Sequence, residues 1–336
     1  KIQKKQPRLG PLNIMPRVSQ SWLHFEEPIP VTRNVIQRDI QSIYSNPALP
    51  QGSAYVHYPE CMRALVTGSN SGLGFHTAVA LAKENYQLVL AVRSEARGQA
   101  AAARIRSLFP GSHIEVSLLD LSSLNSVRNF VERQGNQEWN LLINNAGAKV
   151  QRPFKTTEDG FEWHTGVNHF GHFALTAGLW PFRAAAARVV TVSSVVATGA
   201  KLSPSSIACE TFDEGKAYAD SKFLNLLFAF NLARLIDEAG HTAVSVAAHP
   251  GFARAEPYGT KLTRIAELLL AQTAEQGAAS IVRATNGSNG DYFAPKNFQL
   301  WGAPALIRRP LKSLDLALMK EQWSIAEEAT NTKFVV

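Results

Sequence analysis

Short apolar runs alternate with segments in which apolar residues recur at helical spacing, from residue 62 onward. The runs predict strands that end at Thr67 and at His249, and others over 88–92, 113–119, 141–144 and 188–193. The periodic segments predict helices over 74–84, 95–109, 124–133, 161–180 and 217–239. This alternation favours an α/β fold, a doubly wound parallel sheet with helices on both faces.

The first sixty residues follow a different pattern. They show little periodicity, and prolines recur throughout, at Pro7, Pro11, Pro16, Pro28, Pro30, Pro47, Pro50 and Pro59. We expect an extended N-terminal arm over 1–60, with one short helix near 33–44, and a single domain over 61–336. Aromatic residues scattered along the arm indicate that it packs against another surface, and the surface of a protein partner is one candidate.

Composition narrows the class of protein. The chain has 336 residues, of which 45% are hydrophobic and 18% charged, as in an ordinary globular protein. No apolar stretch approaches the roughly 18 to 20 residues that cross a bilayer, so no membrane span is expected. The two cysteines, Cys61 and Cys209, are too few for a disulfide framework and favour a reducing compartment.

Charge adds two expectations. The net charge is +7, but the basic residues are scattered and form no stripe with exposed aromatics, which disfavours a nucleic-acid partner. Residues 1–17 are basic and hold no acidic residue. That composition fits an organellar protein, mitochondrial or plastid, whose transit peptide has been removed, and equally a flexible tail or a trimmed sequence. The localisation therefore stays open between an organelle and the cytoplasm.

The stretch TGSNSGLG, from Thr67 to Gly74, joins the first predicted strand to the first predicted helix. At the carboxyl end of a parallel strand, such a turn points the free N–H groups and the positive dipole end of the helix at a bound ligand. Gly68, Gly72 and Gly74 permit a tight turn and a close approach of the backbone to a pyrophosphate. A glycine-rich turn alone is weak evidence, but its place between strand and helix favours a nucleotide site.

The Gly-x-x-x-Gly-x-Gly spacing resembles that of the short-chain dehydrogenase/reductase family. NNAG (Asn144 to Gly147), VNHFGHFAL, RVVTVSS, YADSK and HPG follow in the family's order, and the resemblance covers nearly all of 62–336. The segments NSGLG and GDYFAPKNFQLWGAP are similar to those of the branch of the family that contains retinol dehydrogenases. The resemblance implies a Rossmann-like fold and hydride exchange between a nicotinamide and a carbonyl or alcohol, here a lipophilic one. It implies cofactor contacts by Gly68, Ser69, Asn70, Ser71, Gly72, Leu73, Gly74, Arg93, Asp120, Leu121, Asn145, Ala146, Gly147, Tyr218, Lys222, Pro250 and Gly251.

Four residues carry the implied catalysis. A free phenol has a pKa of about 10, so Tyr218, as acid or base, needs a neighbouring cation. Lys222 lies one helical turn further on and can place its ammonium beside the phenol while bonding the nicotinamide ribose. Ser194 would hydrogen-bond the substrate oxygen. Asn168 matches the family's helix asparagine, which holds a water in the proton relay.

Plainer interpretations exist for the same residues. A Tyr-x-x-x-Lys pair alone is commonly a solvated helix face, Ser194 a strand-end hydroxyl and Asn168 a polar helix residue. The fold context of the motifs favours the catalytic interpretation. His164, His169 and His172 lack the spacing of a two-histidine zinc helix, so no metal is expected. The absence of a G-x-S-x-G elbow disfavours a serine hydrolase.

The end of the second strand predicts the cofactor preference. NAD sites place an acidic residue there, whereas this chain has Val92 followed by Arg93. A guanidinium without a competing carboxylate suits a 2′-phosphate, so NADP(H) is expected in preference to NAD(H).

The chain departs from the family's pattern in three places. Ala255 replaces the usual threonine after Pro250-Gly251, and the segments 195–217 and 252–275 look short for loops that cover a substrate. Two hypotheses remain: an NADP-dependent oxidoreductase, or an accessory subunit of a larger assembly that binds NADP(H) structurally and uses the arm to contact neighbours. Substrate identity, reaction direction and oligomeric state stay open.

Overall fold

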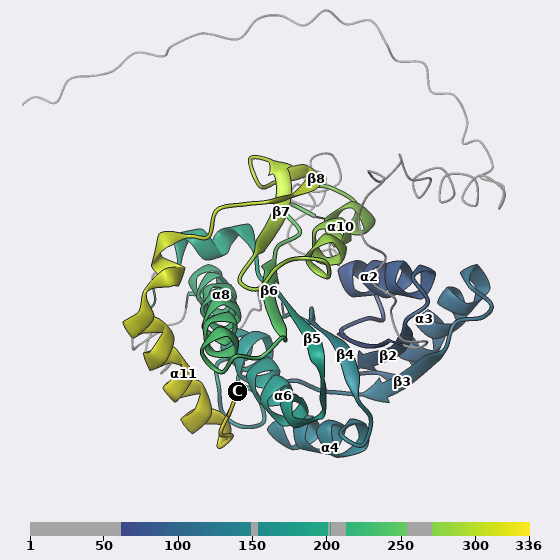
Figure 1. The fold of residues 1–336 in the computed structure, drawn as a ribbon, viewed down its shortest axis with the longest axis horizontal. Coiled ribbons are helices and arrows are strands. Elements are labelled where there is room, and N and C mark those ends of the chain that lie inside the picture. Colours follow the sequence, from purple (N-terminus) through teal and green to yellow (C-terminus); the bar gives the residue numbers. More distant parts are fainter. Residues whose placement is uncertain (1–61, 149–153, 201, 203–212, 254–270) are drawn as a thin grey trace, which may run out of the picture. The chain divides into compact units, whose positions relative to one another are not determined.

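The computed structural model describes residues 62–148, 154–200, 202, 213–253 and 271–336. The expected arm over 1–60, Ala255 and most of the two short loops lie outside the described residues. Within the described chain, the protein forms one sheet in the order β3-β2-β1-β4-β5-β6-β7-β8 (Figure 1). Its strands are β1 (Arg63–Thr67), β2 (Gln87–Val92), β3 (Ile114–Leu118), β4 (Trp139–Asn144), β5 (Arg183–Val192), β6 (Val244–Ala248), β7 (Tyr292–Asn297) and β8 (Trp301–Leu306).

All neighbouring strands pair in parallel except β7 and β8, which are antiparallel. The doubly wound parallel sheet is therefore confirmed, with an antiparallel strand added at one edge. The strand order reverses between β1 and β4, and such a point opens a crevice at the carboxyl ends of the strands. TGSNSGLG and NNAG lie at the carboxyl ends of β1 and β4, on either side of this point.

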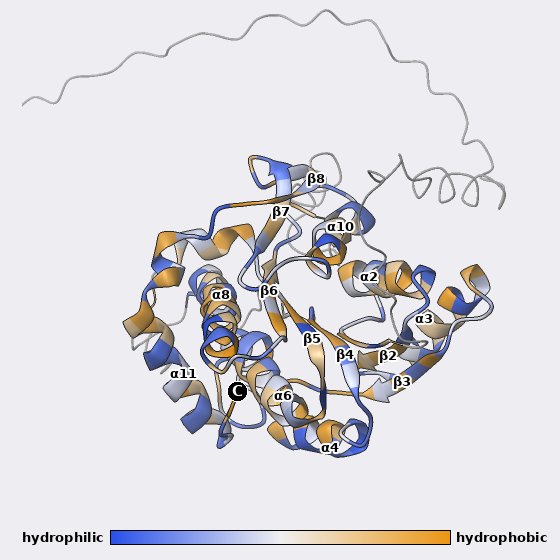
Figure 2. Ribbon diagram, viewed as in Figure 1, coloured by the Kyte–Doolittle hydropathy of each residue, from blue (hydrophilic) through white to orange (hydrophobic). Residues whose placement is uncertain are grey.

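Helices cover both faces of the sheet, because its strands are apolar on both sides (Figure 2). On one face, Ala64 and Val66 pack with α2 (Gly72–Lys83), α3 (Glu95–Leu108) and α10 (Ala274–Ala284). On the other face, Leu65 packs with α4 (Leu124–Gln134), α6 (Gly171–Leu179) and α8 (Glu214–Glu238). The alternation of side chains along β1 thus divides the two cores.

The single helix expected over 161–180 is wrong in detail. The segment begins with one turn, α5 (Trp163–Thr165), continues as a π-helix, η1 (Gly166–Phe170), and then becomes α6. The two glycines that bound the π-helix sit where a Cβ would come within 2.4 Å of Thr157 or 2.6 Å of the Leu121 carbonyl. Close packing of this segment coincides with the wider turn, which apolar periodicity does not reveal.

Elements beyond β6 were not predicted. Thr273 and Gln276 form a capping box at the start of α10, and α11 (Leu316–Thr330) closes the chain. Trp323 of α11 packs against Phe173 and Phe228, so α11 lies on α6 and α8 and not on the sheet.

No helix in the described part of the chain is long and apolar enough to cross a membrane.

Candidate active site

The glycine turn after β1 is built for close approach. Gly68 and Gly72 have φ angles of 65° and 53°, in the left-handed region that side chains disfavour. A Cβ on Gly74 would lie 2.4 Å from the Gly68 carbonyl and 2.5 Å from the Asn145 amide nitrogen. A side chain at position 74 would therefore push the turn away from the loop after β4.

Thr67, the last residue of β1, ties these two segments together. Its hydroxyl accepts hydrogen bonds from the backbone N–H groups of Asn145 and Ala146, both at 2.9 Å. The Asn145 side chain donates in return to the Thr67 carbonyl at 2.8 Å. Thr67 is not among the site residues predicted from the sequence, although its position at the end of the first strand, directly before Gly68, could have indicated a role there.

The turn fits a dinucleotide phosphate. The helix α2 begins at Gly72, and the side chain of its N-cap Ser71 makes no capping hydrogen bond. A Cβ on Gly72 would meet open space, and the buried hydroxyl of Ser69 has no hydrogen-bond partner among the described residues. A helix N-terminus with uncapped N–H groups and a spare hydroxyl suits an anionic group.

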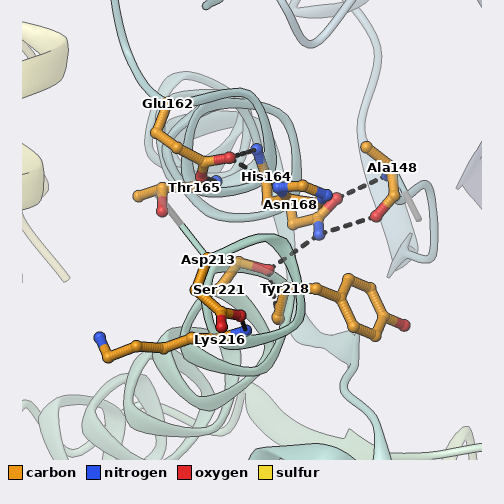
Figure 3. A network of polar contacts seen from close by, with 9 residues as sticks. All are labelled: Ala148, Glu162, His164, Thr165, Asn168, Asp213, Lys216, Tyr218 and Ser221. Atoms are coloured by element: carbon orange, nitrogen blue, oxygen red, sulfur yellow. Dashed lines mark hydrogen bonds and ion pairs between the residues drawn. The ribbon is translucent and has the colours of Figure 1, made fainter. Parts of the chain in front are cut away.

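Asn168 holds the loop after β4 to α8. It lies fully buried in the π-helix, where its side-chain oxygen accepts from Ala148 N at 2.7 Å. Its amide nitrogen donates to Ala148 O at 3.2 Å and to the Ser221 hydroxyl at 2.9 Å (Figure 3). Ser221 donates in turn to the Tyr218 carbonyl. The observed role of this side chain is to join loop and helix, and the water-holding role stays a prediction.

Tyr218 and Ser194 meet at the end of β5. Burial raises the pKa of Tyr218, and a hydrogen bond with Ser194 works in the opposite direction. The sequence predicts that a neighbouring cation lowers this pKa, but desolvation of the phenol has the larger effect. The adjacent Ser193 is buried and donates to the Lys222 carbonyl, so Ser194 is the serine of the pair that faces the phenol.

Lys222 is buried between the end of β5 and the loop after β4. Its side chain is 4% exposed, and its ammonium donates to the Val192 carbonyl at 3.1 Å. A Cβ on Gly147 would lie 3.2 Å from the ammonium, so the loop after β4 passes directly over it. Desolvation lowers the pKa of Lys222 to about 8. A buried lysine with a pKa near physiological pH is typical of a functional site.

The remaining expected cofactor residues lie at the same edge of the sheet. Arg93 is exposed just after β2, whereas Val92 is buried against α3. The Asp120 carboxylate accepts from the backbone N–H and the hydroxyl of Ser122, and Leu121 is buried beside it. The Pro250 carbonyl accepts from Gln272 at 3.2 Å.

The three histidines are engaged separately. His164 pairs with Glu162 at 2.6 Å, and His172 contacts Thr67. Burial works to raise the pKa of Glu162, yet hydrogen bonds from His164 and Thr165 outweigh it and lower that pKa. His169 packs among aromatic rings. No group of three potential metal ligands occurs in the part of the chain that the structure describes.

Comparison with known proteins identifies the class. A sequence model of the family "short chain dehydrogenase" matches residues 62–257, and the chain belongs to that family. Human retinol dehydrogenase 12 is 40% identical over 197 residues, which cover 57% of this chain and 61% of that protein. Mouse polyprenol dehydrogenase is 37% identical over 236 residues, covering 66% of this chain and 70% of that protein. The chain thus falls in the retinol dehydrogenase-like branch, though it spans less than two thirds of retinol dehydrogenase 12.

Solved structures agree on the fold. An uncharacterised protein from Mycobacterium paratuberculosis is 32% identical, with a TM-score of 0.70 over 82% of this chain and 95% of that one. A short chain dehydrogenase from Burkholderia cenocepacia, solved in complex with NADP, is 24% identical with a TM-score of 0.55. The alignment with that protein covers 69% of this chain and 94% of that one.

Proposed function

We propose that the protein is an NADP(H)-dependent oxidoreductase that interconverts a lipophilic alcohol and its carbonyl compound. The observation that carries the proposal is the hydrogen bond between Tyr218 and Ser194 at the end of β5, where the Lys222 ammonium also bonds the strand, at the same edge of the sheet as the glycine turn. A phenol, a hydroxyl and a buried ammonium gathered there can manage the proton that accompanies hydride exchange.

Each side chain has a distinct role. Tyr218 donates its hydroxyl proton to the substrate oxygen during reduction and takes it back during oxidation. Because burial raises the pKa of Tyr218, the phenol holds its proton until that oxygen becomes basic. Ser194 donates a hydrogen bond to the same oxygen as negative charge develops on it. Lys222, four residues further along α8, supplies a positive charge that stabilises the phenolate formed on proton transfer.

The backbone would hold the dinucleotide. Gly68, Ser69, Gly72 and the first turn of α2 would contact its diphosphate, and the loop over Asn145, Ala146 and Gly147 would form the floor toward Lys222. Bound there, the nicotinamide supplies or accepts the hydride. The residues fit this ligand, because the turn has uncapped N–H groups and open space at Gly72.

The preference for NADP(H) rests on Arg93. Its exposed guanidinium follows β2, and the preceding residue, Val92, is apolar and buried. A 2′-phosphate there would gain a cation and meet no carboxylate at either position. The lipophilic substrate is proposed from the relatives, whose names specify retinol and polyprenol. The alternative of an accessory subunit is motivated by the arm, the basic charge and the short loops, and the arm and most of those loops lie outside the described residues.

The test is direct. We expect the purified protein to bind NADPH more tightly than NADH by about tenfold or more, because one charge-assisted contact contributes on that order. It should then reduce at least one member of a panel of retinal, long-chain aldehydes and ketones. Arg93→Asp should reverse the cofactor preference, whereas Arg97→Asp, an exposed arginine one turn into α3, should not. Tight NADPH binding without turnover of any substrate would favour the accessory role.

A further inference from the structure

A histidine that the proposed reaction does not use lies behind the site. His172, at the start of α6, is 2% exposed, and burial lowers its pKa to about 3, so the ring is neutral. Its Nδ1 lies 3.0 Å from the Asn168 carbonyl, and its Nε2 lies 2.9 Å from the Thr67 hydroxyl. Because a carbonyl only accepts, Nδ1 carries the proton and Nε2 is left as an acceptor for Thr67.

The Thr67 hydroxyl is therefore the centre of a chain of hydrogen bonds. It already accepts from two backbone N–H groups, those of Asn145 and Ala146, so its own proton goes outward. Two acceptors lie within reach, His172 Nε2 at 2.9 Å and the Ile143 carbonyl at 3.2 Å. The shorter contact links the end of β1 to α6 across the loop.

The loop over 145–148 is held at both of its ends. Thr67 fixes its first two N–H groups, and the Asn168 side chain fixes both backbone groups of Ala148. His172 contacts both anchors, through the hydroxyl of one and the carbonyl of the other. Between the anchors, Gly147 passes over the Lys222 ammonium.

We propose that His172 is a positioning residue that braces this loop, and thereby aligns the dinucleotide site with the Lys222 ammonium. The proposal rests on the proposed function, because the loop is the floor on which the nicotinamide would lie. A single neutral ring couples two parts of the site, the glycine turn and the π-helix, that differ by about one hundred positions in sequence.

The chain supplies a matched control. His169 is three residues earlier, is also fully desolvated, and has its pKa lowered to about 4 by burial. Its ring lies among Phe170, Phe173 and Phe228 and is hydrogen-bonded to Asn225, while its Nε2 has no hydrogen-bond partner among the described residues. Replacing either histidine by leucine removes a buried imidazole, but only one replacement removes the brace.

The experiment compares His172→Leu with His169→Leu in the full chain. We expect His172→Leu to raise the Kd for NADPH about tenfold and to lower kcat at saturating NADPH about tenfold, since two hydrogen bonds are lost. His172→Gln, whose side-chain amide can both donate and accept a hydrogen bond, should recover most of the NADPH affinity and most of kcat. His169→Leu should lower the melting temperature but change Kd and kcat less than about twofold.

Two further measurements keep the test decisive. Thr67→Val should mimic His172→Leu, and the double variant should lose much less than the product of the two single losses. Hydrogen exchange at the amides of 145–148, measured without cofactor, should accelerate in His172→Leu but not in His169→Leu. If His172→Leu and His169→Leu change the hydrogen exchange and the Kd for NADPH equally, the proposal that His172 braces the loop is wrong. Slow exchange retained in His172→Leu would also overturn it, whereas failure of wild-type protein to turn over substrate bears only on the proposed function.

Discussion

The turn after β1 and the strand end after β5 lie at the same edge of the sheet, with only β4 between them. The first presents backbone N–H groups, with no room for a Cβ at Gly74 and a left-handed backbone at Gly68 and Gly72. The second presents side chains, and two of them, Tyr218 and Lys222, are titratable groups removed from water. Backbone geometry makes the first region intolerant of added atoms, while desolvation makes the second costly in folding free energy.

This difference predicts which measurement each region controls. Substitutions at the end of β5 should reduce turnover while leaving the folded chain intact or more stable. Substitutions in the glycine turn should reduce dinucleotide affinity and stability together.

Removing the phenol hydroxyl should have the largest effect. We expect Tyr218→Phe to lower kcat about 10³-fold or more, because the proton donor is lost, with the Kd for NADPH little changed. The matched control is Tyr292→Phe, since Tyr292 is also buried and its hydroxyl has no partner among the described residues. That variant should keep its activity and be as stable as the wild type or more so. Full activity in Tyr218→Phe would falsify the catalytic assignment.

Lys222→Met should separate activity from stability. Turnover should fall at least about 100-fold, while the free energy of unfolding at pH 7 rises by on the order of 2 kcal/mol, because a desolvated charge is replaced by an apolar chain. The pKa of Lys222 is about 8 in the folded protein and 10.5 in the reference state, so the unfolded chain binds more protons between these values.

The free energy of unfolding of the wild type should therefore rise between about pH 8 and pH 10.5, because Lys222 loses its proton over this range. The free energy of unfolding of Lys222→Met should exceed that of the wild type by its largest amount below pH 8, and this difference should shrink toward pH 10.5. Denaturant unfolding at several pH values measures it. A gap that stays constant with pH would mean that the lysine is not the source.

Gly74→Ala probes the backbone-built region. A methyl group there meets the Gly68 carbonyl at 2.4 Å, so the turn must shift. We expect the Kd for NADPH to rise about 100-fold and the free energy of unfolding to fall by about 2 kcal/mol. Gly111→Ala is the control, because a Cβ there meets nothing within 4 Å, and it should be close to neutral. If the two variants bind NADPH equally well, the turn does not need this close approach.

The pH dependence of reduction should show the smallest effect. If the site needs a cationic Lys222, then kcat/KM should be level below about pH 8 and fall above it, by at most tenfold per pH unit. The Kd for NADPH, measured over the same range, distinguishes loss of binding from loss of catalysis. A profile that stays level to pH 10 would show that the charge on Lys222 is not required.

Much of the fold could be predicted, because parallel strands buried on both faces give uninterrupted apolar runs. The strands and helices from β1 to β6 match their predicted positions closely, except around Asn168. There the π-helix arises from packing against Thr157 and Leu121, which local periodicity does not encode. The C-terminal elements were missed because β8 is a largely exposed edge strand and α11 packs its one aromatic side chain, Trp323, against other helices.

The sequence by itself determined the order of strands and helices, the glycine turn and the succession of motifs, since those depend on spacing along the chain. The three-dimensional packing was needed to show that Ser193 turns to the Lys222 carbonyl, that Lys222 is stripped of water, and that Thr67 and His172 join β1 to α6. Desolvation and hydrogen bonding depend on which groups surround an atom in space. Those neighbours come from segments far apart in the chain.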